Sequence, residues 1–187
     1  MKVLVIPEDP TLDQYILKPI VTRIFADLGK SPRIGVLSNP RLRGVAQALD
    51  SAILADIVSN HPMIDLFLVL VDRDGDTRRS GLARQRETEH QGRLFVCLGI
   101  EEIEVWMLAI HREGLDVSWK EIRAEGHPKE RFAQPFLEEK APRLDPGGGR
   151  AWAMRDLGAR WRGVLQCCEE LDELRQRVGD WLEARPT

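Results

Sequence analysis

Residues 66–71 (LFLVLV) form an uninterrupted apolar run, and this run constrains the fold more than any other segment. A run of this length is typical of a strand, and its lack of polar alternation indicates that both faces of the strand are covered. Sheets with two covered faces are mostly parallel and carry helices on each side. The run therefore predicts a central strand of a parallel sheet.

Strand-like and helix-like segments alternate around this run. The predicted strands are residues 2–6, 33–38, 66–71 and 93–99. The predicted helices are residues 16–28, 45–58 and 77–91 and a fourth that opens at Glu101. Four strand–helix repeats predict an α/β fold of Rossmann-like type, with a mostly parallel four-stranded sheet.

The pattern changes after residue 112, where no further strand is predicted. Short helices and proline-broken loops follow, then the turn DPGGG at residues 145–149 and a last helix at residues 159–184. We therefore predict an α/β domain at residues 1–112 and a helical C-terminal extension at residues 113–187 that packs on it.

Composition limits where such a protein acts. Hydrophobic residues make up 43% of the 187 residues, which is enough to bury a full core. No apolar run reaches the roughly 20 residues of a transmembrane helix, and the apolar start of the chain is too short for a signal peptide. The three cysteines lack zinc-binding spacing, so we expect them to be reduced. We expect a cytoplasmic protein without membrane contact.

Acidic residues follow three of the four predicted strands. They are Glu8 and Asp9 after the first, Asp72, Asp74 and Asp76 after the third, and Glu101, Glu102 and Glu104 after the fourth. Because parallel strands bring their carboxyl ends to one edge of the sheet, these groups are expected to meet there. A divalent cation offsets their mutual repulsion, and magnesium prefers oxygen ligands. The alternative is that each acid only forms a turn or caps a helix.

Arginines gather in two regions, although the net charge of the chain is −3. Residues 78–93 and residues 141–162 each contain five arginines against two acidic residues. Such local patches can hold the phosphates of a nucleic acid, and we assign Arg78, Arg79 and Arg150 to this role. The alternative is a solvated surface in which these arginines pair with nearby acids.

A response-regulator receiver domain also fits part of the pattern. Glu8 and Asp9 would be its acidic pair, and Asp72 would be the residue that is phosphorylated. Receivers also require a hydroxyl residue at the end of the fourth strand and a lysine after a fifth. Here the fourth strand ends in Leu98 and Gly99, and no fifth strand is predicted. A signalling domain phosphorylated on Asp72 is kept as a second reading.

Three segments together resemble the TOPRIM domain. They are VLVIPEDPTLDQYIL with Glu8, LFLVLVDRDGD with Asp72 and Asp74, and LGIEEIEVWMLA with Glu102 and Glu104. The third is similar to segments of small TOPRIM proteins and, more loosely, of OLD-family nucleases. Two positions depart from the usual pattern: Asp9 stands where glycine is usual, and Asp13 stands one position late, after Leu12.

The resemblance implies Mg²⁺- or Mn²⁺-dependent phosphodiester chemistry on DNA or RNA. In a nuclease of this type Glu8, Asp72 and Asp74 would hold the metal, and Glu102 or Glu104 would complete its ligands. Glu8 and Lys129 would be the catalytic residues. The resemblance further implies a defence role with an ATPase partner protein, and we also consider a homodimer. A TOPRIM-like interaction module without activity is a further alternative.

Overall fold

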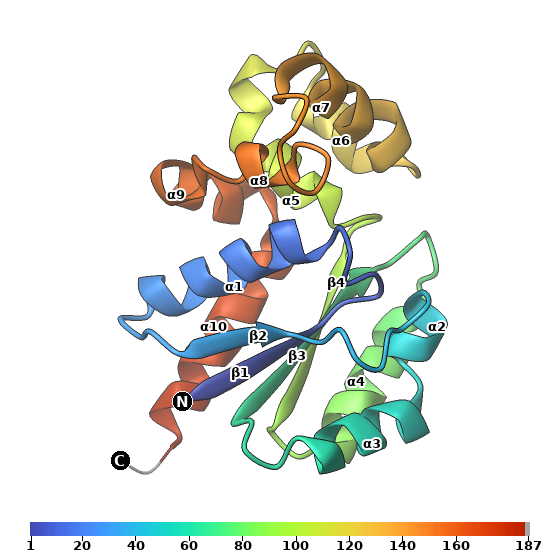
Figure 1. The fold of residues 1–187 in the computed structure, drawn as a ribbon, viewed down its shortest axis with the longest axis vertical. Coiled ribbons are helices and arrows are strands. Elements are labelled where there is room, and N and C mark those ends of the chain that lie inside the picture. The colour runs from blue at the N-terminus through green and yellow to red at the C-terminus, as the bar shows by residue number, and fades with distance from the viewer. Residues whose placement is uncertain (186–187) are drawn as a thin grey trace.

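The strands form one parallel sheet in the order β2-β1-β3-β4, which confirms the predicted α/β fold class (Figure 1). The computed structural model describes residues 1–185. The strands are β1 Lys2–Ile6, β2 Arg33–Val36, β3 Leu66–Asp72 and β4 Leu94–Gly99. All lie within the predicted strand segments except that β3 extends by one residue, to Asp72.

The helices of the α/β part are α1 Gln14–Asp27, α2 Val45–Ala48, α3 Ser51–Asn60, α4 Arg79–Glu89 and α5 Glu104–His111. The later helices are η1 Arg112–Gly114, α6 Trp119–Ala124, η2 Lys129–Ala133, α7 Gln134–Lys140, α8 Arg150–Ala153, α9 Leu157–Cys167 and α10 Glu169–Glu183. Helices α5 to α8 gather next to α1, on the side where the strands end (Figure 1). Within residues 1–185, none of these helices has the length and apolar character needed to cross a membrane.

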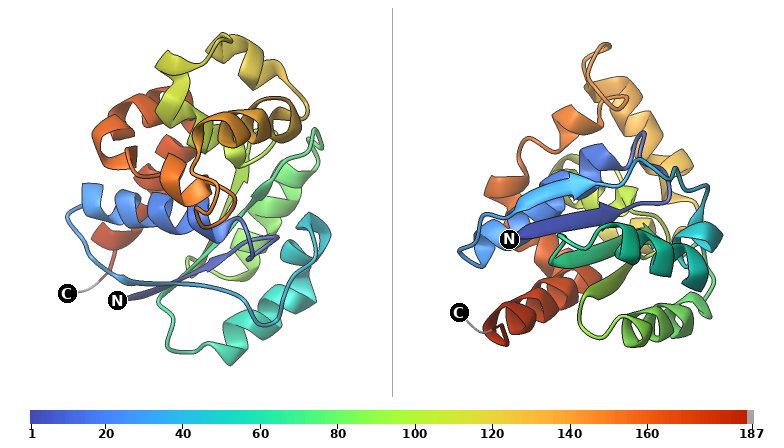
Figure 2. Two further views of the ribbon diagram at one scale, coloured as in Figure 1. Left: turned by 45° about the horizontal axis from the view of Figure 1, so that its top comes forward. Right: turned by 60° about the horizontal axis from the view of Figure 1, so that its bottom comes forward.

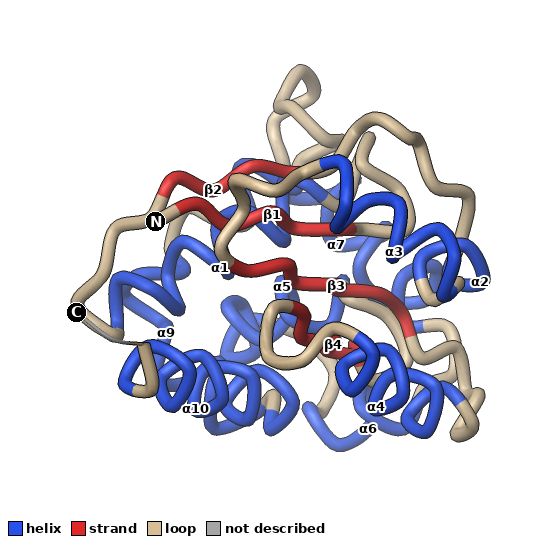
Figure 3. The backbone as a smooth tube through the Cα atoms, turned by 90° about the horizontal axis from the view of Figure 1, so that it is seen from below, coloured by secondary structure: helices blue, strands red, loops and turns tan. Residues whose placement is uncertain are grey.

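The strand β3 is buried on both faces, as its apolar run predicted (Figure 3). Leu66, Leu68 and Leu70 pack in one hydrophobic cluster with helices α1, α5, α9 and α10. Phe67 and Val69 point the other way, into a second cluster with α2, α3 and α4. Helices thus cover both faces of the sheet, so a functional site is expected at the carboxyl ends of its strands.

Two of the predicted helices are each divided in two. The segment 45–58 breaks before Asp50, whose carboxylate accepts a hydrogen bond from the Ile53 N–H at 2.9 Å and so starts α3. The segment 159–184 breaks at Cys168, whose backbone is not helical (φ −122°, ψ 81°). Acidic residues fill the first turn of α10, which favours a new helix start. The apolar periodicity continues across both breaks, so it did not predict them.

The C-terminal helices share their core with the sheet, because residues of α9 and α10 belong to the same cluster as β1 and β3. Helix α10 lies beside the strands (Figure 2). Helices α4 and α10 together cover the edge strand β4: the Val96 N–H donates to Glu87 Oε1 of α4 at 2.6 Å, and Arg177 of α10 donates to the Val96 carbonyl at 3.4 Å. The division at residue 112 stays a prediction, but residues after it complete the core of the α/β part.

Candidate functional site

The ends of three strands meet at one edge of the sheet. In the parallel register Asp72 at the end of β3 pairs with Gly99 at the end of β4, and Ile6 of β1 pairs with Val69. Glu8 follows β1 by two residues, and Glu102 lies in the turn between β4 and α5. The predicted acids of three strand ends therefore lie in one neighbourhood.

Three carboxylates form the centre of the site. Asp72, Asp74 and Glu102 each offer an oxygen, and these oxygens lie within 4.8 Å of one another. Asp72 and Glu102 are buried, whereas Asp74 is exposed and opens the cluster to solvent. This is a set of hard oxygen donors in which two members are already desolvated.

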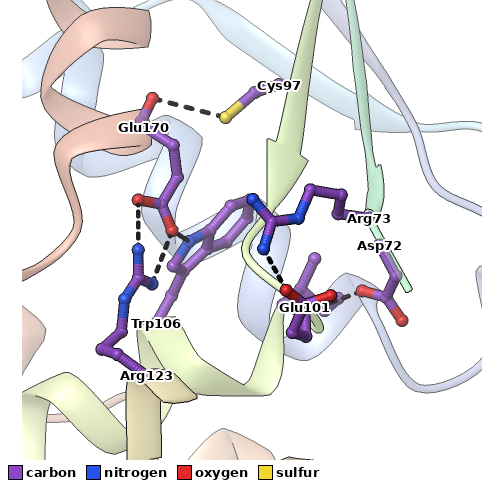
Figure 4. A network of polar contacts seen from close by, with 8 residues as sticks. Asp72, Arg73, Cys97, Glu101, Trp106, Arg123 and Glu170 are labelled. Atoms are coloured by element: carbon purple, nitrogen blue, oxygen red, sulfur yellow. Dashed lines mark hydrogen bonds and ion pairs between the residues drawn. The ribbon is translucent and has the colours of Figure 1, made fainter. Parts of the chain in front are cut away.

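The loop after β3 holds Asp74 in place. Asp74 has a positive φ of 46°, a conformation that aspartate tolerates better than most residues. Its N–H donates to the Glu101 carbonyl at 3.0 Å, and the Arg73 N–H donates to the same oxygen at 3.0 Å. The Glu101 carboxylate in turn binds the Arg73 side chain and the Gly75 N–H (Figure 4). Glu101 therefore joins the two loops and is not itself a member of the cluster.

Asp72 is held from two sides. Its Oδ1 accepts a hydrogen bond from the Ile103 N–H at 2.8 Å, and its carboxyl shares a further hydrogen bond with Glu8. Burial, the contact with Glu8 and the charge of Glu104 together raise the pKa of Asp72 well above its usual range. The raised pKa of Asp72 reflects repulsion between neighbouring carboxylates, which a bound cation would offset.

Asp13 is a buried member of this region. The sequence pattern named it only as a departure from the TOPRIM pattern and gave it no role in the site. Its Oδ2 accepts a hydrogen bond from the Asp9 N–H at 3.0 Å, just before α1. Burial, followed by the charges of Glu104 and Glu8, raises the pKa of Asp13 to about 7. The available signal was an aspartate at the start of a helix, which is also common for plain helix starts.

Glu104 lies beside the cluster but is engaged by two cations. Its side chain is only 1% exposed, and Arg150 Nη2 donates to Glu104 Oε1 at 2.7 Å. Lys129 Nζ lies 3.6 Å from the same oxygen. A buried carboxylate in this position is neutralised by the protein itself. Between the two predicted ligands after β4, the geometry favours Glu102, and the metal role of Glu104 stays a prediction.

Lys129 reaches the site from the C-terminal extension. Its N–H donates to Glu102 Oε2 at 2.6 Å, so its backbone orients a carboxylate of the cluster. Burial lowers the pKa of Lys129, but Glu104 and Asp72 outweigh burial and the net shift is upward. The side chain is therefore a cation beside the cluster, as the resemblance implied.

Arg150 also comes from the extension, at the start of α8. The three glycines before it all have positive φ, and a Cβ on Gly147 would lie 2.3 Å from the ring of Tyr15 in α1. This close approach brings Arg150 to Glu104. Within residues 1–185 the buried Nε–H of Arg150 has no hydrogen-bond partner. The side chain is thus largely buried beside the cluster, and its Nε–H is shielded from solvent.

The two arginines at the start of α4 differ in their surroundings. Arg79 Nη1 donates to the Asp72 carbonyl at 2.9 Å and to Asp74 Oδ2 at 2.6 Å, so Arg79 braces the cluster. Arg78 is 89% exposed and pairs with Asp76 at 2.9 Å. Only Arg78 is exposed enough to meet a ligand from solvent without rearrangement.

A second network fixes α5, the helix that begins at Glu104. Glu170 of α10 accepts hydrogen bonds from Trp106 Nε1 at 2.9 Å and from both Arg123 amino groups at 2.9 and 3.0 Å (Figure 4). The Cys97 thiol donates to the Glu170 carbonyl at 3.4 Å. The Arg123–Glu170 pair is bidentate and largely buried, so it joins α6 to α10, and the Trp106 hydrogen bond joins α5 to α10.

No protein-family model, no curated protein and no solved structure matches this chain.

Proposed function

We propose that this protein is a divalent-metal-dependent phosphodiester hydrolase acting on nucleic acid, with a site of TOPRIM type. The observation that carries the proposal is the meeting of Asp72, Asp74 and Glu102 at one sheet edge, with oxygens within 4.8 Å of one another. Glu8 hydrogen-bonds to Asp72 at the same place. Acids that follow three different strands lie close together there. If these acids only formed turns or capped helices, they would have no reason to meet.

The donor set fits Mg²⁺ or Mn²⁺. Carboxylate oxygens are the ligands that hard cations prefer, and this cluster contains no sulfur ligand. Asp72, Asp74 and Glu102 would hold the metal, with Glu8 beside them. When bound, the metal polarises a phosphate and lowers the pKa of water.

The remaining side chains have separate proposed roles in proton transfer and in binding the phosphate. Glu8 is partly exposed beside Asp72, where its carboxylate can accept the proton of the attacking water. Lys129 and Arg150 supply positive charge for the phosphorane-like transition state. Arg78 is placed to contact a phosphate further along the strand.

The receiver reading has less support. A phosphoacceptor aspartate must be reached by a phosphodonor, but Asp72 is 8% exposed and its Oδ1 is bound to the Ile103 N–H. The inactive-module reading is an outcome of the activity test below. An ATPase partner and a homodimer are implied by the resemblance alone and stay predictions.

The test incubates end-labelled single-stranded and double-stranded DNA and RNA with the protein in Mg²⁺, Mn²⁺ or chelator. We expect cleavage that requires the metal and that falls at least about a hundredfold in Asp72→Asn, because this change removes a proposed ligand of the metal. Asp76→Asn is the matched control, because Asp76 lies in the same loop and pairs only with Arg78. Cleavage that survives chelation, or that is equal in the two variants, contradicts the proposal, and a complete lack of cleavage favours the inactive module.

A further inference from the structure

A hollow of about 640 Å³ lies between helix α3 and the loop that joins β2 to α2. Its floor is apolar and includes Leu42, Ile53 and Ile57, of which Leu42 and Ile57 are buried. Its rim is polar. The volume lies within the range of about 300–1,000 Å³ that is usual for small-molecule sites. Nothing in the proposed catalytic cluster uses this hollow.

A second hollow lies beside the first and includes Glu8 in its lining. This one, of about 460 Å³, is lined by Glu8, Asp9, Arg41, Leu42, Arg43 and Gly44. Arg41 and Leu42 line both hollows, so the two adjoin at these residues. A molecule whose reacting group lies at Glu8 can therefore extend past Arg41 into the larger hollow.

The residues at the junction are suited to a phosphate. The Arg41 side chain is 64% exposed, and it is steadied by Thr11 Oγ1 at 3.1 Å and by Asp9 at 3.6 Å. Arg43 is exposed as well, and Gln47 Oε1 accepts its backbone N–H at 2.8 Å. Two cations next to an acidic cluster can hold the backbone of a strand whose adjacent phosphate enters that cluster.

The rim of the larger hollow is suited to a nucleobase. Asn39, Gln47 and Asn60 contribute amides, which both donate and accept hydrogen bonds. In the described part of the chain no intramolecular hydrogen bond engages the amides of Asn39 and Asn60, so both can bind a ligand. His61 Nδ1 lies 2.8 Å from the Ile57 carbonyl, which directs its other ring nitrogen to a different partner. An apolar floor with an amide rim matches the flat face and polar edge of a base.

We propose that this hollow binds an unpaired nucleobase of a single-stranded nucleic acid, with the attached phosphate on Arg41 and Arg43 and the next phosphodiester at Glu8. The proposal rests on the proposed function, since it takes the strand to be the substrate of the acidic cluster. It favours single strands because a base held in a duplex cannot enter a pocket, whereas an unstacked base can be read on its edge.

The test compares two short single-stranded oligonucleotides of equal length and charge, one with bases and one wholly abasic, by fluorescence anisotropy in chelator. The protein should bind the base-containing strand at least about tenfold more tightly. Ile53→Trp, which fills the hollow, and Asn60→Ala should remove this difference. Arg41→Ala should weaken binding of both strands by similar factors.

Two matched variants serve as controls. Ser59→Ala changes the neighbour of Asn60 on α3, and Arg33→Ala removes an exposed arginine at the other end of β2, so both should bind like the unchanged protein. Melting temperatures of all variants in chelator verify folding. Equal binding of the two strands by the unchanged protein, or full base preference in Ile53→Trp, overturns the proposal.

The metal response separates this proposal from the proposed function. Stabilisation by Mn²⁺ depends on Asp72 and should be unaltered in Ile53→Trp. A metal response without base preference overturns the base site alone. Base preference without a metal response or cleavage supports the base site and overturns the hydrolase.

Discussion

Replacing Asp72 by asparagine should make the metal-free protein more stable. Asparagine keeps an oxygen for the Ile103 N–H and offers an amide N–H to Glu8, so the two hydrogen bonds of Asp72 have substitutes. It also removes a carboxyl that is buried among Glu8 and Glu104. The change therefore retains the packing and removes the electrostatic cost.

The magnitude follows from the shifted ionisation. The pKa of Asp72 is 3.8 when unperturbed and is raised in the folded protein, chiefly by burial. A group with a raised folded pKa contributes stability that is present below its unfolded pKa and lost as pH increases towards the folded value, by about 1.4 kcal/mol per pH unit. Between pH 3.8 and pH 8 this loss sums to about 6 kcal/mol as an upper limit, since the raised pKa is already a net value. We expect Asp72→Asn to gain at least about 2 kcal/mol at pH 8, which raises the melting temperature by at least about 4–8 °C for a chain of this length.

Bound metal should make the unchanged protein more stable than Asp72→Asn, the reverse of their order in chelator. At a metal concentration one hundred times its dissociation constant, binding stabilises the folded state by about 2.7 kcal/mol. The unchanged protein should gain this, and Asp72→Asn should gain almost nothing. Because the raised pKa of Asp72 makes protons compete with the metal for its carboxylate, the gain should be larger at pH 8 than at pH 6.

Thermal melts of both proteins are recorded in chelator and in Mn²⁺, each at pH 6 and pH 8. They measure the difference in melting temperature between Asp72→Asn and the unchanged protein under each of these four conditions. Asp76→Asn is again the control and should follow the unchanged protein under every condition. The reasoning is refuted if Asp72→Asn melts below the unchanged protein in chelator, or if Mn²⁺ stabilises the two equally.

Three further changes test neighbouring parts of the structure. Asp13→Asn should gain stability over the unchanged protein as pH rises from about 4, reaching up to about 4 kcal/mol near pH 7, because the pKa of Asp13 is raised to about 7. Urea unfolding at several pH values measures the difference in unfolding free energy between the two proteins, and a difference that does not change with pH contradicts the prediction. Gly147→Ala places a methyl group against Tyr15 at a positive φ and should cost about 2–3 kcal/mol in thermal melts, whereas Gly126→Ala, with open space around it, should cost less than about 1 kcal/mol. Lys129→Met should lower metal-dependent cleavage at least about a hundredfold in a rate assay, and an equal loss in Lys140→Met, which changes an exposed lysine paired with Glu139, would remove Lys129 from the site.

The sequence predicted those parts of the fold and site that depend on neighbouring residues. The apolar run 66–71 predicted β3, and the acids directly after it lie at the sheet edge because a strand delivers the residues that follow it. Lys129 and Arg150 differ, because packing between distant segments brings them to Glu104. The spacing of residues along the chain does not predict that packing. The position of Lys129 was implied only by the TOPRIM resemblance.

The same limit explains the role of Arg79 and the place of Asp13. Both residues stand beside charged or polar neighbours in the sequence, where a solvent-exposed side chain is the usual outcome. In the structure Arg79 turns inward to the Asp72 carbonyl, and Asp13 is 6% exposed. The hydrogen-bond partners of both residues are close in sequence: Arg79 donates to Asp72 and Asp74, and Asp13 accepts from the Asp9 N–H. Whether these side chains turn inward depends on the conformation of the loops after β1 and β3, which residue spacing does not predict.

The position of α10 on the sheet has a consequence for the order of events during synthesis. The strands leave the ribosome before residues 157–183, and these residues complete the cover of the face on which Leu66, Leu68 and Leu70 also pack against α1 and α5. Until residues 157–183 emerge, that face is covered only in part, and partly exposed apolar surfaces attract chaperones or other nascent chains. The α/β part therefore completes its core only after these residues have been synthesised, and a ribosome that stalls before residue 169 leaves a product without α10.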